Sequence, residues 1–282
     1  MNFTNLLGLP DAFVAAVRND SYTGGGDISV TRLIDSPQKR VLGKKFREFV
    51  VEDVSDRVWS LMGQCMHTLL ERAATSAKVE ERLYMNVNGW ALSGQFDRLH
   101  VADKCLQDWK VTTCYKAKGD EAWTRQLNIL RALAIHNGYD VQKLQVIAIL
   151  RDWRRAEALR NPDYPQQNVL IIDVPVWDLE DTHAYIKERI ALHQKAEEDL
   201  SVGCTDEERW YAGSTYALIK IGGKRATKVA PSREELGDPP VGSEIIERRG
   251  GYRRCEGFCE VAPFCQQWKA DQEKANGTNV EY

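Results

Sequence analysis

The sequence predicts an α/β protein with a mixed central sheet flanked by helices. Segments whose apolar residues recur at helical spacing alternate along the chain with short, β-branched or alternating runs of strand type. The predicted order is a helix, three strands, a helix, two strands and a helix. The chain has 282 residues, of which 43% are hydrophobic and 28% charged, so a sizeable core is feasible.

The first half of this core is predicted to be a helix followed by three strands. The helix covers Asp53–Lys78, where apolar residues recur every three or four positions. Leu83–Asn88 and Ala91–Val101 are predicted strands, and the dipeptide Asn88-Gly89 between them is typical of a two-residue hairpin. A third strand, Cys105–Val111, follows a short turn.

The second half alternates helices and buried strands. Glu121–His136 has helical periodicity and ends before Asn137-Gly138, a common helix stop. Lys143–Leu150 and Val169–Val174 are β-branched runs of buried-strand type. Asp178–Leu200 is a long amphipathic helix.

The chain divides by composition into three parts. Residues 1–26 form an N-terminal extension, and residues 27–201 contain the core. After residue 201 periodicity weakens and Gly, Pro and charge become frequent. Residues 202–282 are therefore interpreted as a C-terminal appendage that carries a cysteine cluster and packs on the core.

The bulk properties exclude several classes. No apolar run approaches the ~20 residues of a membrane span, so we expect no membrane partner. The first residues, MNFTNLLGLPDAF, lack a secretory signal, and seven cysteines is an odd number. We therefore expect a cytoplasmic protein without a disulfide framework. A net charge of −3 disfavours a simple DNA-binding module, but less so an enzyme with a carboxylate-rich, cation-binding site.

Asp97, Asp108 and Lys110 form the most informative pattern. Asp108 and Lys110 are two apart on a predicted strand and face one way, and Asp97 lies on the strand before. Two carboxylates suit Mg²⁺ or Mn²⁺, which would activate a water and orient a phosphate, while Lys110 would position that water or stabilise charge. A buried Asp108–Lys110 ion pair beside a surface Asp97 explains the same spacing.

Three helical residues extend the pattern. His67 lies on the first predicted helix, upstream of the acidic strands, and could be a further metal ligand. Trp123 and Gln126 begin the next helix and could reach a nucleic-acid substrate. The alternatives are a packing or surface histidine, a packing tryptophan and a solvent-facing amide.

In this order the residues resemble the PD-(D/E)XK nucleases, in their RecB-like exonuclease branch, which includes phage-type and CRISPR-associated RecB-like exonucleases. The resemblance runs from about residue 27 to residue 268. Its motifs are Ile28–Leu33 with Ser36-Pro37, Gly63 to His67, Gly94-x-x-Asp97, Asp108-x-Lys110 and Gln126.

The resemblance implies a restriction-endonuclease-like core and a metal-dependent deoxyribonuclease. Its site residues would be His67, Asp97, Asp108 and the backbone carbonyl of Trp109 as metal ligands, Lys110 as the catalytic lysine and Gln126 as a catalytic or DNA-holding residue. Some relatives also have an acidic residue near Glu81. The implied setting is phage or bacterial recombination, repair or DNA processing, in the host cytoplasm if phage-encoded. Because the chain has no Walker-type ATP-binding loop, any helicase or recombination protein would be a separate partner.

Two departures from the family leave questions open. The glutamine motif usually ends in tyrosine four positions on, where this chain has Leu130, so exonuclease and endonuclease both remain possible. Iron–sulfur relatives place a cysteine at the position of Ser36.

The C-terminal cysteines form a second candidate metal site. Cys255, Cys259 and Cys265 lie close together in sequence, and Cys204 is the best substitute for the missing fourth ligand. They could hold a [4Fe-4S] cluster, Zn²⁺ or no metal at all.

Two other functions are also compatible with the sequence. One is a catalytically decayed module on the same fold that binds nucleic acid or assembles with other proteins. The other is a nuclease that acts on RNA.

Overall fold

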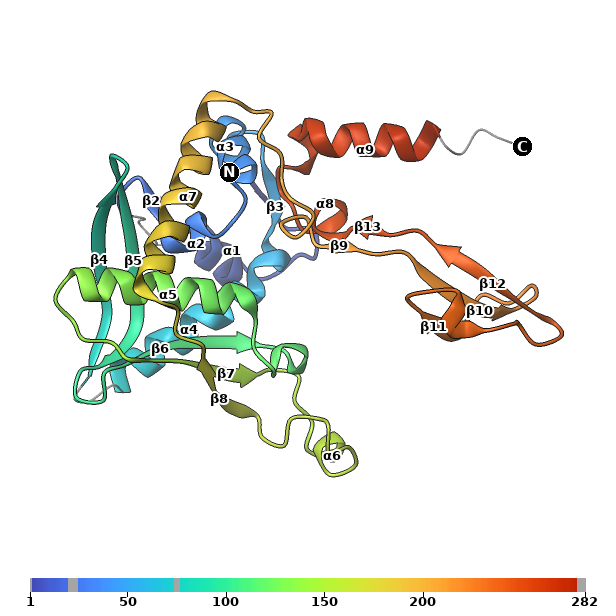
Figure 1. The fold of residues 1–282 in the computed structure, drawn as a ribbon, viewed down its shortest axis with the longest axis horizontal. Coiled ribbons are helices and arrows are strands. Elements are labelled where there is room, and N and C mark those ends of the chain that lie inside the picture. Colours follow the sequence, from blue (N-terminus) through green and yellow to red (C-terminus); the bar gives the residue numbers. More distant parts are fainter. Residues whose placement is uncertain (1, 20–24, 74–76, 278–282) are drawn as a thin grey trace. The chain divides into compact units, whose positions relative to one another are not determined.

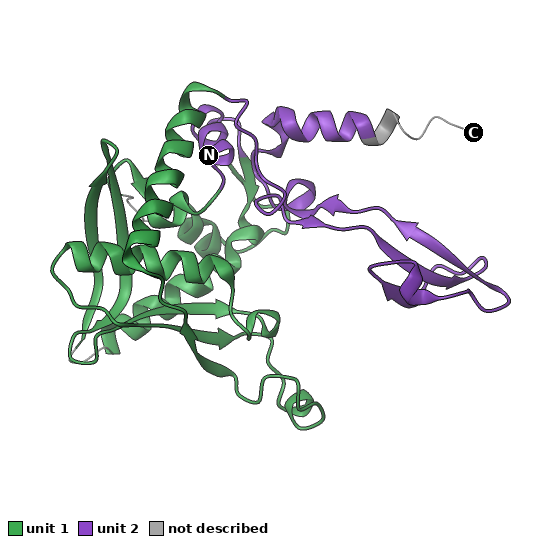
Figure 2. Cartoon of the chain, in the orientation of Figure 1, with its two compact units in different colours: residues 1–35, 51–199 green, residues 36–50, 200–282 purple. Residues whose placement is uncertain are grey.

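The computed structural model describes residues 2–19, 25–73 and 77–277. Two compact units divide the chain (Figure 2). Unit 1 comprises residues 1–35 and 51–199, and unit 2 comprises residues 36–50 and 200–282. The segment 36–50 therefore groups with the C-terminal region, whereas the sequence placed it in the core. Parts of the predicted N-terminal extension and appendage, at residues 1, 20–24 and 278–282, lie outside the described residues.

Unit 1 is built on a six-stranded mixed sheet (Figure 1). The strand order is β2-β5-β6-β7-β8, and β4 also pairs with β5. The pairs β2–β5 and β6–β7 are parallel, and the other three are antiparallel. The predicted mixed α/β fold is confirmed. The strands are β2 (Ile28–Ser29), β4 (Lys78–Val87), β5 (Trp90–His100), β6 (Cys105–Thr112), β7 (Lys143–Leu150) and β8 (Val169–Val174).

Helices flank this sheet and complete the core. Helix α5 presents Leu127, Leu130 and Leu133 to the strands, all of them buried. Its N-terminus is capped by Asp120, whose carboxylate accepts a hydrogen bond from the backbone of Ala122. The helices of unit 1 are α1 (Asp11–Arg18), α2 (Val30–Leu33), α4 (Val58–Ala73), α5 (Glu121–His136), α6 (Arg155–Ala158) and α7 (Leu179–Glu198).

The structure shortens the first predicted helix. Val51–Asp53 is instead strand β3, paired in parallel with β1 (Asn2–Thr4), and Val54–Arg57 is a 3₁₀ turn. The carboxylate of Asp53 accepts a hydrogen bond from the backbone of Ser55 and so fixes the turn before α4 begins.

Unit 2 contains short elements around a small apolar cluster. Leu42, Val50, Val261 and Cys265 are buried together. Strands β10 to β12 form a separate antiparallel sheet with the order β11-β10-β12. The elements are α3 (Pro37–Lys45), β9 (Tyr211–Ala212), β10 (Thr215–Lys220), β11 (Ala226–Ala230), β12 (Ser243–Arg248), β13 (Gly251–Tyr252), α8 (Arg253–Gly257) and α9 (Gln266–Gly277). In the described parts of both units, no helix is long and apolar enough to cross a membrane.

Candidate metal centre

A groove of about 860 Å³ in unit 1 contains the predicted nuclease residues. Helix α4 supplies His67, β5 supplies Asp97, β6 supplies Asp108 and Lys110, and α5 supplies Gln126. Helix α4 packs against β6 and β5, which brings its histidine to the acidic strands. The fold therefore brings together five side chains that are spread over 60 positions of the sequence.

His67, Glu80 and Asp97 form the tightest group of potential ligands. Nδ1 of His67 lies 3.5 Å from Oδ1 of Asp97 and 3.6 Å from Oε1 of Glu80. One ligand atom from each residue lies within 4.8 Å of the other two. This is the spacing of donor atoms around a single cation, so the group could bind a metal ion.

Glu80 was not identified from the sequence. It lies on β4 between Val79 and Glu81, whose partners on β5 are Arg98 and Phe96, so it stands opposite Asp97. Its φ of 50° is unusual for a non-glycine residue and interrupts the strand pairing there. Two carboxylates opposite each other repel unless a cation or proton lies between them.

Neighbouring side chains fix the Glu80 carboxylate. Nε2 of Gln95 donates a hydrogen bond of 2.6 Å to Oε2 of Glu80, and Arg82 donates one of 2.7 Å to Oε1 of Gln95. Glu81, the residue that the resemblance suggested, accepts a hydrogen bond from Tyr139 and is not part of the group. Glu80, and not Glu81, therefore belongs to this group of potential ligands.

Asp108, Lys110 and Gln126 form a second network beside this group. Nζ of Lys110 lies 2.8 Å from Oδ2 of Asp108 and donates a hydrogen bond of 3.2 Å to Oε1 of Gln126. Nε2 of Gln126 donates one of 3.0 Å to Oδ1 of Asp108. Gln126 thus contacts both members of the ion pair.

The backbone of Trp109 links the two networks. Its N–H donates a hydrogen bond of 2.6 Å to Oδ2 of Asp97. Its carbonyl oxygen, the predicted backbone ligand, lies 3.1 Å from Nε2 of His67. His67, Asp97 and the Trp109 carbonyl are therefore brought together as predicted. Asp108 lies beside them and forms an ion pair with Lys110. Glu80, rather than Asp108, is the third member of the tightest group.

The charges at the site are strongly perturbed. Burial raises the pKa of Asp97 to about 7, with a further contribution from Asp108, while His67 opposes the rise. A hydrogen bond to Glu80 raises the pKa of His67 despite burial. Burial lowers the pKa of Lys110, but attraction to Asp108 outweighs it, so this pKa lies above its ordinary value. The site carries excess negative charge in a poorly solvated position.

A buried carboxylate oxygen fits the requirement for a cation. Within the described residues, Oε1 of Glu80 accepts no hydrogen bond shorter than its 3.6 Å contact with Nδ1 of His67, whereas Oδ2 of Asp108 has the Lys110 ammonium as its partner at 2.8 Å. Buried oxygens of this kind are costly unless they find a partner, and a divalent cation supplies one. The donor set of carboxylates, an imidazole and a carbonyl suits a hard or borderline divalent ion.

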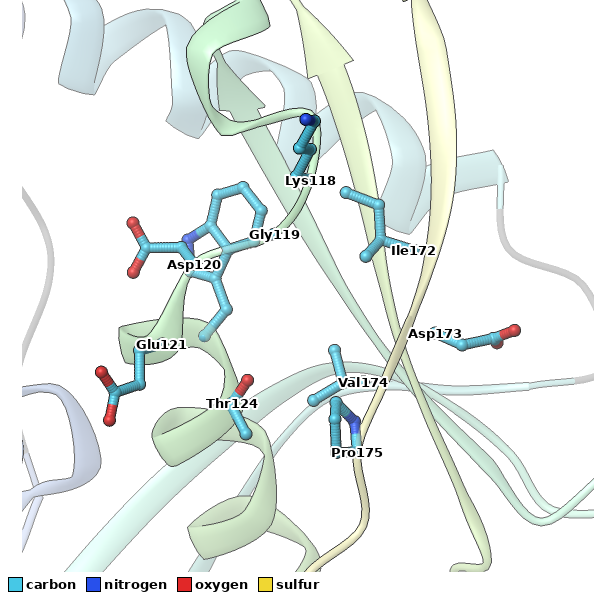
Figure 3. Close-up of a pocket in the computed structure, with 10 residues that line it drawn as sticks. Lys118, Gly119, Asp120, Glu121, Thr124, Ile172, Asp173, Val174 and Pro175 are labelled. Atoms are coloured by element: carbon cyan, nitrogen blue, oxygen red, sulfur yellow. The ribbon is translucent and has the colours of Figure 1, made fainter.

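The structure places Trp123 away from this groove. Trp123 is buried in the core and lines a different pocket of about 390 Å³. That pocket lies between the start of α5 and strand β8, with Ile172 and Val174 facing it and Asp173 pointing away (Figure 3). The geometry agrees with the packing interpretation of Trp123.

Several of the cysteines gather near the start of α3 in unit 2. Sγ of Cys204 lies 2.8 Å from Oγ of Ser36, and both Cys204 and Cys265 contact Oε1 of Gln38. Burial raises the pKa of Cys204 to about 11, and the thiols of Cys265 and Cys259 add to the rise. Cys255 instead accepts a hydrogen bond from Arg209.

The cysteine cluster does not have the tight geometry of the His67 group. Sγ of Cys204, the predicted substitute ligand, lies beside Ser36, the position where the resemblance expects a cysteine. Among the residues with a described position, however, no three cysteine sulfurs lie within 4.8 Å of one another.

Comparisons with known proteins give little further information. No protein-family model and no curated protein matches the chain. Among solved structures, that of SSO0001 is similar, with a TM-score of 0.45 and 18% identical residues. The similarity covers 64% of this chain and 84% of that chain. At this distance it does not bear on function.

Proposed function

We propose that the protein is a metal-dependent nuclease of the restriction-endonuclease-like, RecB-like type that hydrolyses phosphodiester bonds in DNA. The observation that carries the proposal is the group formed by His67, Glu80 and Asp97, next to the Asp108–Lys110 pair and in the same groove. The ordered motifs of the sequence point to the same chemistry. Mg²⁺ or Mn²⁺ is the proposed cofactor.

A bound divalent cation would supply an activated water and neutralise charge on the phosphate. His67, Glu80, Asp97 and the Trp109 carbonyl would hold it. Lys110 has the complementary task, because its ammonium can donate hydrogen bonds to the attacking water or to a phosphate oxygen. Asp108 and Gln126 keep that ammonium at the site and prevent it from turning into solvent.

A cleavage assay tests the proposal. Wild-type protein is incubated with labelled linear, circular and single-stranded DNA in Mg²⁺, Mn²⁺ or EDTA. We expect cleavage with either metal and none in EDTA. Asp108→Asn should abolish it, whereas the matched control Asp103→Asn, an exposed residue in the turn between β5 and β6, should not.

The same assay separates the remaining alternatives. Resistance of closed circles indicates an exonuclease, and their cleavage indicates an endonuclease. Cleavage of RNA alone would contradict the DNA assignment. Metal-independent DNA binding without cleavage of any substrate would contradict the enzyme proposal and indicate a non-catalytic module.

For the cysteines of unit 2 we propose a [4Fe-4S] cluster, with Cys204 as the ligand that replaces the missing cysteine at Ser36. The adjacency of Cys204 and Ser36 supports this assignment. Anaerobically purified protein should be brown, with broad visible absorbance that Cys204→Ser removes. Colourless protein containing zinc, or no metal, would contradict it.

A further inference from the structure

The hairpin formed by β10 and β11 is strongly basic. Residues 215–233 contain five basic residues and no acidic one, although the whole chain has a net charge of −3. Four of the cations, Lys220, Lys224, Arg225 and Lys228, lie on this hairpin or its turn, and all four are exposed. We call residues 215–230 the basic arm.

The cations of the basic arm are not neutralised by the protein. Across the described ranges, no carboxylate pairs with Lys220, Lys224 or Arg225. Lys228 donates a hydrogen bond to a backbone carbonyl, that of Glu235. The positive charge therefore faces solvent and is available to an anionic partner.

The turn of the basic arm is closed and carries few side chains. The N–H of Gly223 donates a hydrogen bond of 2.7 Å to the carbonyl of Lys220, and Gly222 has a φ of 75°. Ile221 lies at this turn with 68% of its surface exposed. Two adjacent glycines allow another backbone to approach closely. The backbone N–H of Ile221 donates a hydrogen bond to the carbonyl of Gly242, which leaves its exposed apolar side chain free to insert into a nucleic-acid groove.

Lysines can also prevent a sheet edge from pairing with other chains, but this role explains only part of the arrangement. Strand β11 is a sheet edge, and edge lysines discourage pairing with other chains. That role fits Lys228. It does not require Lys224 and Arg225, which lie in the turn, or an exposed Ile221.

We propose that the basic arm binds the backbone of double-stranded DNA. The basic arm belongs to the three-stranded sheet β11-β10-β12, and its solvent-facing cations can contact the phosphates of a duplex. Tyr216 is the one aromatic residue of the basic arm and is half-buried at the end of β10 away from the turn, whereas proteins that hold single strands stack successive bases on aromatic rings. The inference rests on the proposed function in one respect, namely that DNA is the substrate.

The test is duplex binding in EDTA, where no cleavage occurs. Affinity for a labelled duplex and for a single strand of the same sequence is measured over a range of salt concentrations. Lys224→Ala/Arg225→Ala should bind the duplex more weakly, with a slope of log affinity against log salt that is smaller by about 1.8. Lys187→Ala/Lys195→Ala makes the same charge change on exposed positions of α7 and should leave the slope unchanged.

Ile221→Ser tests the tip separately. It should lower duplex affinity without changing the salt slope. Duplex affinity equal to that of the wild type would remove the contact by Ile221 from the proposal. The proposal would be overturned if Lys224→Ala/Arg225→Ala had the same salt slope as the wild type. It would also be overturned if the α7 control reduced the slope as much as the arm variant does. Cleavage of a short single strand by the arm variants, assayed with metal, should match the wild type. Absence of cleavage in all proteins would contradict the nuclease proposal and leave the arm result intact.

Discussion

Replacing Asp97 by asparagine should stabilise the metal-free protein at alkaline pH. Burial raises the pKa of Asp97 from 3.8 to about 7, so the folded state holds a proton that the unfolded chain releases. A raised carboxyl pKa gives stability that is present below the unfolded pKa and lost as pH rises towards 7. At ~1.36 kcal/mol per pH unit, the raised pKa of Asp97 lowers the free energy of unfolding by about 4 kcal/mol at pH 8 and about 2 kcal/mol at pH 5.

Urea unfolding in EDTA at pH 5 and pH 8 measures this cost. Asp97→Asn should be more stable than the wild type, with the larger gain at pH 8, while exposed Asp163→Asn should show no such pattern. With saturating Mn²⁺ the order should reverse, because the cation stabilises only the ionised wild-type site. If Asp97→Asn is less stable than the wild type by the same amount at both pH values, the pKa of Asp97 is not raised in the metal-free fold, and the prediction is wrong.

Three further predictions concern neighbouring residues. Glu80→Gln should weaken Mn²⁺ binding at least about tenfold in calorimetric titration, and Glu81→Gln should not; equal effects would exclude Glu80 as a ligand. Gln126→Leu removes two hydrogen bonds to charged groups, worth about 1.5–3 kcal/mol each, so kcat should fall by tenfold or more with metal affinity nearly unchanged. Gly94→Ala should cost about 1–3 kcal/mol in unfolding free energy, because a Cβ there would lie 2.6 Å from Leu130; unchanged stability would show that α5 can yield.

The elements that the sequence predicted best have strong local signals. The bounds of α5, β7 and β8 match the predicted ranges, since periodicity and β-branched runs are continuous there. Asn88 and Gly89 have φ values of 49° and 79°, as the predicted hairpin requires. This hairpin aligns β4 with β5 and thereby places Glu80 opposite Asp97.

Glu80 was missed because the predicted strand began at Leu83. Continuing the hairpin register back from Val87 and Trp90 would have placed Glu80 opposite Asp97. The strands of unit 2 were missed for a different reason. They are short, and β11 and β12 together contain one buried residue, so the apolar alternation that marks a strand is weak there. Trp123 illustrates a third limit, because sequence alone does not tell which face of a helix meets the core.

The most direct test of the nuclease account is the rate of DNA cleavage by Lys110→Ala in Mn²⁺. The substitution leaves His67, Glu80 and Asp97 in place, so we expect metal and DNA binding to persist while cleavage falls by at least a hundredfold, about 3 kcal/mol of transition-state stabilisation. Lys143→Ala, on the neighbouring strand, should cleave like the wild type. Wild-type cleavage rates in Lys110→Ala would contradict the account.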